Sequence, residues 1–572
     1  MNKDELTSEI KFNYIPINLD SIKELSLLEP INNNINTDNP LFFGIFDIRV
    51  NQSPITTTQQ TINIAVDGSA SMTESCNDGK EKIQHIKHTV KNILNYILTK
   101  PEIKVTLNVF VFESKVTDIL VNETVTQENI EELKRKIDKI YADGGTNIEL
   151  ALKKFIELSK NSYGVISNIF MSDGYANEGV TNSKKLTGLV NESVSNTFIG
   201  FGIEHNPQLL SDLSSGSNAS YFYIDILENA GHVYGEILHG ILYKRFKNTI
   251  LTIQNGLVYN WKTNSWSSSL LIGDLISDTC KQYHIISNSC EEVKCILTGD
   301  DILSDLHMNK EFCFNEFYDD LTKYYFRQKT LQMLFNSRHL NNDEDEDENE
   351  VEYYSYNLDT VKLDNVEDKK KQMDKIKEKN ENIKLFKKQM KNLIKEMEDY
   401  VKEYNITEDK FIKNLCLDIA ICYKTIGTKL GQMYSCSRQT SQGTQRVHSV
   451  RTPRKNQYSL TPCSRNSYKF VNDNSDNNNS DDDSIFNGLK SPRKNKIKNK
   501  TSQFNSFDSL DHLLNENENE DEDEDEDEDD VIDKYIHDDI TLELDIDIDT
   551  PHYCSNTLMT TIRSINDKNE DD

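Results

Sequence analysis

The sequence lacks the common signatures of membrane, zinc-binding and nucleotide-hydrolysing proteins. No run approaches the roughly 18 apolar residues of a membrane span, and the opening Met-Asn-Lys-Asp-Glu-Leu-Thr has no apolar signal-peptide core. None of the ten cysteines lies in a C-x-x-C pair, and neither H-E-x-x-H nor G-x-x-x-x-G-K occurs. We therefore expect an intracellular protein, cytoplasmic or nuclear, with reduced thiols.

Positive charge is also in short supply. The chain has 64 Lys and Arg against 95 Asp and Glu, a net charge of −31, which disfavours binding to nucleic acid or to anionic membranes. Hydrophobic residues make up 36% and the mean hydropathy is −0.65, low values for a chain that packs throughout. The 572 residues therefore imply several domains together with segments that form no core.

Residues 61–243 alternate between strand-like and helix-like segments. The segment 103–112 is apolar on both parities toward its end, as expected of a central strand covered on both faces. The first helix places apolar residues at spacings of three and four, namely Ile83, Ile86, Val90, Ile93 and Ile97. The pattern predicts an α/β fold, a doubly wound and mostly parallel sheet with helices on both faces.

Oxygen-bearing side chains follow apolar segments at three places in this region. The run 62–66 ends at Asp67-Gly68-Ser69-Ala70-Ser71, Thr146 follows two glycines, and Asp173 follows the run 169–172. Ligands of open α/β sheets bind at the carboxyl ends of strands, so we expect these segments to converge. Carboxylate and hydroxyl oxygens suit a hard cation such as Mg²⁺. The candidate metal ligands are Asp67, Ser69, Ser71, Thr146 and Asp173.

The order D-x-S-x-S, then Thr, then Asp resembles the metal-ion-dependent adhesion site (MIDAS) of von Willebrand factor A (VWA) domains. Ala70 departs from the family, which usually has Gly there. The resemblance implies that Ser69, Ser71 and Thr146 bind Mg²⁺ or Mn²⁺ directly and that Asp67 and Asp173 act through bound waters. It also implies that an Asp or Glu of a protein partner completes the shell. The alternative is that Asp67 and the serines only cap a helix and close a turn.

Residues 244–315 are predicted to form a small antiparallel β module. Their short apolar runs are separated by Asn-Gly, Thr-Asn-Ser and Gly-Asp turns. Phe42–Val50 also has strand character, and we expect residues 41–60 to pair with the module. The VWA-like region would then be inserted into a small β-sandwich, preceded by a partly ordered segment, 1–40.

Residues 316–435 are predicted to be helical, with an acidic spacer at 341–352. Apolar residues recur every seven positions in 365–404, which fits either a coiled coil or a helix packed on its neighbour. We favour a C-terminal helical hairpin within the chain and keep self-association through 365–404 as the alternative.

Residues 436–572 are polar and of low complexity, so we expect a mostly disordered tail. Strict alternation of apolar and acidic residues predicts one strand within it, at 541–549. Thr452 and Ser491, each before proline and basic residues, resemble substrates of proline-directed kinases.

Three functions remain open from the sequence. The first is an intracellular, metal-dependent protein-binding module or scaffold. The second is a non-catalytic subunit of an enzyme assembly of the ubiquitin-ligase or chelatase type. The third is a structural scaffold whose metal site does not function. We expect no catalysis by the chain itself, because no nucleophile is paired with a base in the sequence motifs.

Overall fold

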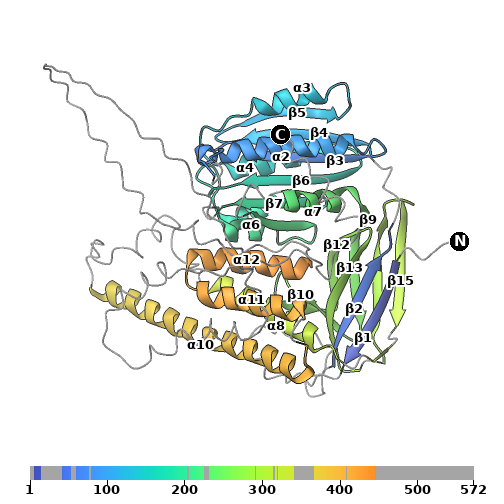
Figure 1. Ribbon diagram of the computed structural model, residues 1–572, viewed down its shortest axis with the longest axis vertical. Helices are drawn as coiled ribbons and strands as arrows, with labels where there is room; N and C mark the ends of the chain where they lie inside the picture. The colour runs from blue at the N-terminus through green and yellow to red at the C-terminus, as the bar shows by residue number, and fades with distance from the viewer. Residues whose placement is uncertain are drawn as a thin grey trace, which may run out of the picture. The chain divides into compact units, whose positions relative to one another are not determined.

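The computed structural model, shown in Figure 1, describes part of the chain in detail. The described residues are 6–13, 42–52, 59–76, 79–202, 205–224, 231–289, 291–313, 316–317, 320–340, 366–406 and 409–445. The predictions for the acidic spacer, for Thr452 and Ser491, for the strand 541–549 and for the tail beyond 445 lie outside these residues. So does most of the prediction for 1–40.

A six-stranded sheet with the order β5-β4-β3-β6-β7-β8 forms the core of the region 60–242. Its strands are β3 (Gln60–Asp67), β4 (Val105–Phe112), β5 (Val116–Thr124), β6 (Val165–Ser172), β7 (Ser195–Phe201) and β8 (Ala219–Ile224). Only β5 at the edge runs antiparallel to its neighbour in this sheet. The predicted α/β class with a mostly parallel sheet is confirmed.

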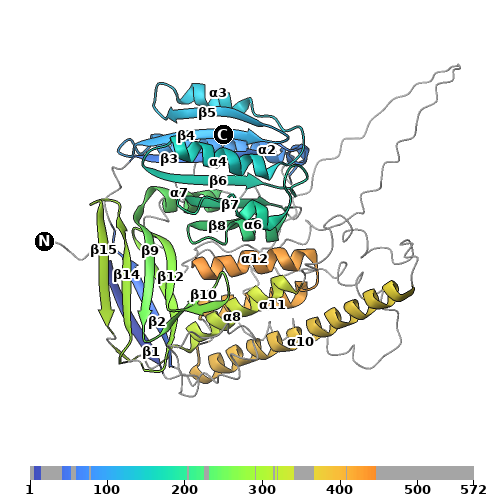
Figure 2. The ribbon, with the colours of Figure 1, turned by 180° about the vertical axis from the view of Figure 1, so that it is seen from behind.

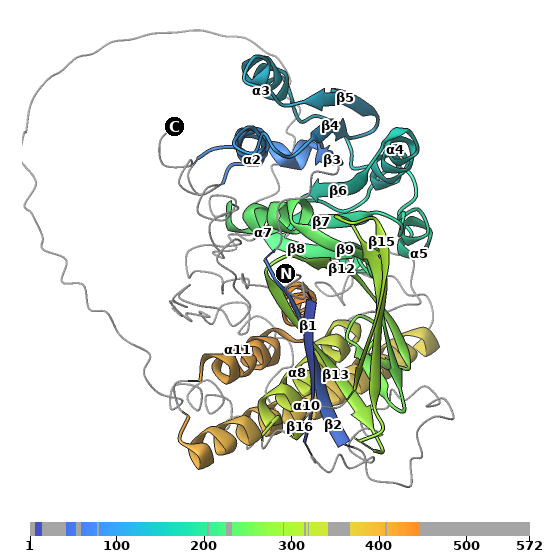
Figure 3. The ribbon, with the colours of Figure 1, turned by 90° about the vertical axis from the view of Figure 1, so that its right-hand side faces the viewer.

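Helices cover both faces of this sheet (Figure 3). One face carries aliphatic side chains such as Ile62, Ile64 and Val66, which pack against α2 (Lys82–Leu98), α3 (Ile130–Asp138) and α7 (Gly231–Leu242). The other face carries α4 (Ile148–Asn161), α5 (Ser183–Thr187) and α6 (Pro207–Leu213). Burial on both faces explains why β3 is buried at every position.

Four buried asparagines cross the second face side by side, and we call them the asparagine ladder. Asn63 of β3 lies opposite Asn108 of β4 and Asn168 of β6, and Asn168 lies opposite Asn196 of β7. The Asn108 amide donates to Asn63 Oδ1 at 2.8 Å. The Asn63 and Asn168 amides donate to Oδ1 of Asn168 and Asn196, each at 2.9 Å. Buried amides of this kind are tolerated because each finds a partner.

Aromatic rings form the next level along the same face, two residues further along β4, β6 and β7. Phe110 packs on Phe155 of α4 with ring centroids 5.3 Å apart, and Phe170 packs on Phe198 at 5.7 Å. Two residues further again, β3 and β6 end at Asp67 and Ser172. The same strand registers therefore set the ladder, the aromatic level and the edge where the candidate site was predicted.

Two further sheets pack face to face around a separate apolar core. One has the order β11-β10-β13-β2-β1-β16 and the other the order β12-β9-β14-β15. Strand β2 (Phe42–Val50) lies between β13 (Thr279–Ser287) and β1 (Leu6–Asn13), so residues before and after the central α/β region share one sheet. The remaining strands are β9 (Lys244–Gln254), β10 (Leu257–Asn260), β11 (Ser265–Ser267), β12 (Ser269–Ile276), β14 (Lys294–Asp301), β15 (Leu306–Cys313) and β16 (Glu316–Phe317).

The described residues after the sandwich include the helices α8 (Thr322–His339), α10 (Val366–Tyr404), α11 (Lys410–Thr425) and α12 (Lys429–Thr444) (Figure 2). The heptad residues Met390, Ile394, Met397 and Val401 of α10 are fully buried, and α10 packs on α11 and α8. Tyr404, also in the predicted heptad, is 55% exposed. Packing within the chain accounts for the described part of the heptad pattern, and self-association stays a prediction.

The predicted start of the disordered tail at 436 is wrong for the residues up to 445. Helix α12 continues to Thr444, and Cys436, Arg438 and Gln439 are buried. The cause is that the polar side chains find partners: Arg438 Nη1 lies 2.7 Å from Asp418 Oδ1 of α11, and the Gln439 amide donates to the Trp261 carbonyl at 2.8 Å. A paired polar helix can pack although its composition resembles that of a disordered segment.

None of the helices in the described ranges combines the length and the apolar character needed to cross a membrane.

Candidate metal centre

The five candidate ligands converge at the carboxyl edge of the central sheet. Asp67 is the last residue of β3, and Asp173 directly follows β6. Ser69 precedes a single 3₁₀ turn at Ala70–Thr73 that contains Ser71, and Thr146 lies just before α4. Asp67, Ser69, Thr146 and Asp173 are buried, whereas Ser71 is half-buried.

Hydrogen bonds link Asp67, Ser69, Ser71 and Asp173, and the Thr146 hydroxyl lies beside them. The Ser69 and Ser71 hydroxyl oxygens lie 3.0 Å apart, and the Ser71 hydroxyl donates to Asp173 Oδ1 at 2.8 Å. Asp67 accepts from the Ser69 backbone N–H at 2.8 Å. A methyl group placed on Gly174 would lie 3.4 Å from Thr146 Oγ1 and 3.8 Å from Ser71 Oγ, so both hydroxyls border Gly174.

The loop that follows β3 is held by backbone contacts on both sides. The Gly68 N–H donates to the Phe112 carbonyl at 2.9 Å, and a methyl group on Gly68 would lie 2.4 Å from the Val111 side chain. The Ala70 N–H donates to the carbonyl of Gly144, which has a φ of 129° that favours glycine. Ala70 is exposed, so the methyl group that departs from the family pattern meets no steric obstacle.

Thr146 is positioned by a residue that the sequence analysis missed. Asn177 Oδ1 accepts from the Thr146 N–H at 2.7 Å, and the Asn177 N–H donates back to the Thr146 carbonyl at 3.1 Å. The neighbouring Asn147 caps α4 by accepting from the Leu150 N–H at 3.2 Å. These contacts fix the backbone of Thr146, although Thr146 belongs to no strand. Its hydroxyl therefore keeps its place beside the cluster.

Two more residues complete the cluster and were also missed. The Ser172 hydroxyl donates to Asp67 Oδ2 at 2.6 Å. The Lys82 ammonium, at the start of α2, lies 2.6 Å from Asp173 Oδ2 and 2.5 Å from Glu74 Oε2. Ser172 was within reach of sequence reasoning because it belongs to the Ser-Asp-Gly string, whereas no local pattern marks Lys82 as a neighbour of Asp173.

Asp67 lacks a cationic side chain as an ion-pair partner among the described residues. Burial, together with the neighbouring Asp173 carboxylate, raises the pKa of Asp67 to about 7, against the lowering effect of the Ser172 and Ser69 hydrogen bonds. For Lys82, burial lowers the pKa, but attraction to Asp173 and Glu74 outweighs burial and raises it. Lys82 pairs with Asp173 and Glu74, and no ion pair is formed by Asp67 within the described residues.

The donor set fits a hard divalent cation. Three hydroxyl oxygens and two carboxylates meet at one edge, and these are the oxygen donors that a hard cation prefers. No cluster of three or more His, Cys, Asp or Glu suited to a metal occurs in the part of the chain that the structure describes.

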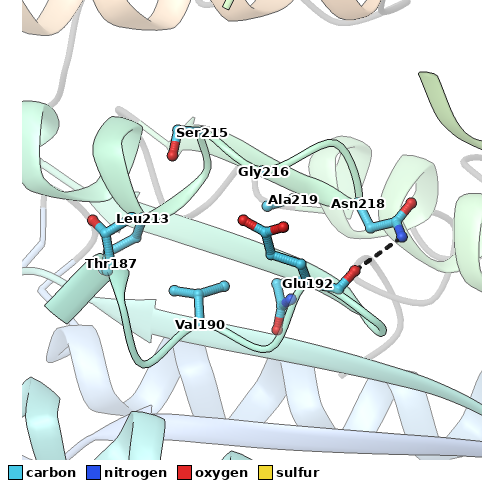
Figure 4. A pocket seen from close by; sticks show the side chains of 9 residues that line it. Thr187, Val190, Glu192, Leu213, Ser215, Gly216, Asn218 and Ala219 are labelled. Atoms are coloured by element: carbon cyan, nitrogen blue, oxygen red, sulfur yellow. Dashed lines mark hydrogen bonds between the residues drawn. The ribbon is translucent and has the colours of Figure 1, made fainter. Parts of the chain in front are cut away.

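A separate small pocket lies away from this edge (Figure 4). It is lined by residues near the amino ends of β7 and β8, including Asn196 and Ala219, and its volume is about 10 Å³. The Asn218 amide donates across it to the Glu192 carbonyl at 3.1 Å. A space of this size holds no more than a water molecule, so the pocket offers no second ligand site.

Residues 61–233 match the family model described as von Willebrand factor type A domain. No curated protein matches the chain. Among solved structures, a von Willebrand factor type A protein from Catenulispora acidiphila is 11% identical over 59% of this chain and 82% of its own, with a TM-score of 0.43. The ArnB paralog VWA2 from Sulfolobus acidocaldarius is 13% identical over 77% and 98%, with a TM-score of 0.45. Proximal thread matrix protein 1 from the mussel byssus, solved with a zinc-occupied MIDAS motif, is 18% identical over 32% and 46%, with a TM-score of 0.27.

Proposed function

We propose that the von Willebrand factor type A domain formed by residues 61–233 is a metal-dependent protein-binding module. Ser69, Ser71 and Thr146 bind Mg²⁺ or Mn²⁺ directly, and Asp67 and Asp173 hold it through water. A carboxylate from an Asp or Glu of a protein partner completes the shell. The observation that carries the proposal is the convergence of three hydroxyls and two buried carboxylates from three distant segments.

The donor chemistry supports an open coordination position. Hydroxyls are neutral ligands, so a cation held mainly by them keeps much of its charge and attracts an incoming carboxylate. The site lies at the carboxyl edge of the sheet, where ligands of open α/β sheets bind. Tyr175, which follows Asp173 and Gly174, is 40% exposed, and Tyr141 in the loop before Thr146 is 65% exposed. These rings offer apolar contact area beside the cation.

We propose binding rather than catalysis for the same residues. The Ser71 hydroxyl donates to Asp173, and that carboxylate is already paired with the Lys82 ammonium. Because both oxygens of Asp173 are engaged by these two partners, we assign Asp173 to holding the site rather than to activating Ser71 as a nucleophile. The function proposed for the chain is therefore recognition, within the cell, of an acidic segment on another protein.

Calorimetric titration of the full chain with Mg²⁺ and with Mn²⁺ tests the metal site. Thr146→Val removes one hydroxyl ligand while the backbone contacts to Asn177 persist, and we expect it to weaken ion binding at least tenfold. The matched control is Thr61→Val, which removes a hydroxyl that donates to the Tyr163 carbonyl away from the site. We expect the control to bind the ion like the parent chain. The absence of any heat of binding in the parent chain, with either ion, would refute the proposal.

Affinity capture tests the partner carboxylate. The full chain is immobilised in Mg²⁺, exposed to cell extract and then washed with EDTA. We expect a specific protein to be released by EDTA from the parent chain and to be absent from the Thr146→Val chain. Substitution of the partner's Asp and Glu by Asn and Gln then identifies the carboxylate. A partner that stays bound in EDTA indicates instead the scaffold role in which the metal site has no part.

A further inference from the structure

The Lys82 ammonium occupies an unusual place for a residue near a cation site. Its Nζ lies 2.6 Å from Asp173 Oδ2, and the Lys82 side chain is only 15% exposed. The Asp173 carboxylate is fully buried, so this contact is sheltered from solvent. Asp173 is also the residue whose other oxygen accepts from Ser71. Lys82 therefore contacts the carboxylate that the proposed metal needs.

Glu74 gives the same ammonium a second partner. Glu74 Oε2 lies 2.5 Å from Lys82 Nζ, and the Glu74 side chain is 60% exposed. Two carboxylates, Asp173 and Glu74, thus lie against a single ammonium. The Lys82 stem has four rotatable carbons, so its charge can leave Asp173 and remain at Glu74.

We propose that Lys82 is a tethered cation that competes with the divalent ion for Asp173. Without metal, its ammonium neutralises Asp173 in the buried cluster. When the ion binds, the ammonium leaves Asp173 and stays with Glu74. Lys82 thereby lowers the affinity of the site for Mg²⁺ and keeps the metal-free domain folded. This inference rests on the proposed function, because it concerns the same metal site.

The charge balance supports this exchange. A divalent ion and an ammonium that both lie against Asp173 would repel each other strongly at such short range, since Coulomb energies rise as separation falls. Removing the ammonium without supplying metal would instead leave the buried Asp173 carboxylate with no cation beside it. Lys82 and the divalent ion are therefore alternative partners of Asp173.

Calorimetry and thermal melting of the Lys82→Met chain test the inference. We expect Mg²⁺ to bind about tenfold more tightly than to the parent chain, and the melting temperature in EDTA to fall. Mg²⁺ is expected to restore the melting temperature, which separates loss of charge from misfolding. The matched control is Lys91→Met on the same helix, which removes a lysine paired with Asp138 and is expected to leave ion affinity unchanged.

A second variant keeps the test sharp if Lys82→Met folds poorly. Glu74→Gln removes the exposed alternative partner, so the ammonium stays at Asp173 and ion affinity falls. Part of that fall comes simply from the lost negative charge. The double variant Lys82→Met with Glu74→Gln isolates the remainder, and we expect the effect of Glu74→Gln to shrink when Lys82 is absent.

The outcomes separate this inference from the proposed function. If the parent chain binds Mg²⁺ and Lys82→Met binds it with the same affinity, the competition is refuted and the metal site stands. If only Lys82→Met binds Mg²⁺, the competition is supported in its strongest form and the parent chain's metal dependence is refuted. If neither chain binds the ion, both ideas fail.

Discussion

The molecule buries acidic side chains in two contrasting ways. Between α11 and α12, Asp418 is buried with two polar partners of its own, the Arg438 guanidinium at 2.7 Å and the Gln442 amide at 2.8 Å. At the edge of the central sheet, Asp67 and Asp173 are buried with hydroxyls, a backbone N–H and one ammonium that is shared with Glu74. The helical cluster balances its charge, whereas the sheet edge keeps an excess of negative charge.

The difference distinguishes a structural ion pair from a candidate binding site. A buried carboxylate with a dedicated guanidinium has no need of an outside cation, and its removal harms the fold. Burial raises the pKa of both Asp67 and Asp418, so a raised pKa does not separate the two sites. The difference is that Asp418 has an ion-pair partner, whereas Asp67 forms no ion pair within the described residues.

The largest effect that would sharpen this contrast comes from Arg438→Met. This change leaves Asp418 buried without its guanidinium, and we expect the free energy of unfolding to fall by about 3–5 kcal/mol. Urea denaturation followed by circular dichroism measures it. The control Arg135→Met alters an exposed arginine of α3 and is expected to change stability by no more than about 0.5 kcal/mol. Equal effects of the two changes would remove the distinction between the regions.

A smaller loss is expected from Asn63→Leu in the asparagine ladder. The change leaves the Asn108 amide and Asn168 Oδ1 without their ladder partner, and a buried unsatisfied group costs about 1–3 kcal/mol. The ladder lies in the same sheet as the candidate site but is fully paired. A clear loss of stability, again measured by urea denaturation, would show that the hydrogen-bond partners of a buried polar group decide its contribution to stability, whatever its position in the sheet. An unchanged midpoint would contradict that view.

The smallest effect, and the one of opposite sign, is expected from Asp67→Asn in EDTA near pH 5. The unfolded chain releases the Asp67 proton near pH 3.8, whereas the folded chain keeps it up to about pH 7. The contribution of this carboxyl to stability is therefore present below pH 3.8 and is lost as the pH rises toward 7. Relative to the parent chain, Asp67→Asn should stabilise by about 1.4 kcal/mol one pH unit above the ordinary value, near pH 5.

Thermal melting of both chains between pH 4 and pH 8 measures this difference, because every other titrating group is common to the two. With Mg²⁺ present at pH 7 or above, where the parent carboxyl is charged, the order should reverse: the parent chain binds the ion and the variant binds it weakly. If the difference in melting temperature between the two chains does not change with pH, the pKa of Asp67 is the same in the folded and the unfolded chain.

Much of the central fold could be predicted from the sequence, and the reasons are local. The spacing of Ile83, Ile86 and Val90 predicts a helix, and the apolar run before Asp67 predicts a buried strand. The structure has both. The five candidate ligands could be placed together because parallel strands end at one edge. Their proximity follows from topology, whereas their binding of metal stays a prediction.

The remainder depends on contacts between segments far apart in the chain. Lys82 and Asn177 have no local pattern that marks them as neighbours of Asp173 and Thr146. The asparagines of the ladder are even harder to foresee, since a lone Asn in an apolar run resembles a loop signal. The extent of α12 was missed because Arg438 and Gln439 look solvent-exposed until Asp418 and Trp261 are placed beside them.

The asparagine ladder also bears on how accurately distant segments can meet. A slip of β6 by one residue would shift Asp173 by about 3.3 Å along the strand and turn its side chain toward the opposite face of the sheet. The same slip would remove Asn168 from both Asn63 and Asn196, so misaligned strands forfeit two amide contacts together. A misaligned strand that would displace Asp173 therefore loses hydrogen bonds inside the sheet. This free-energy cost arises away from any loop that a partner would touch.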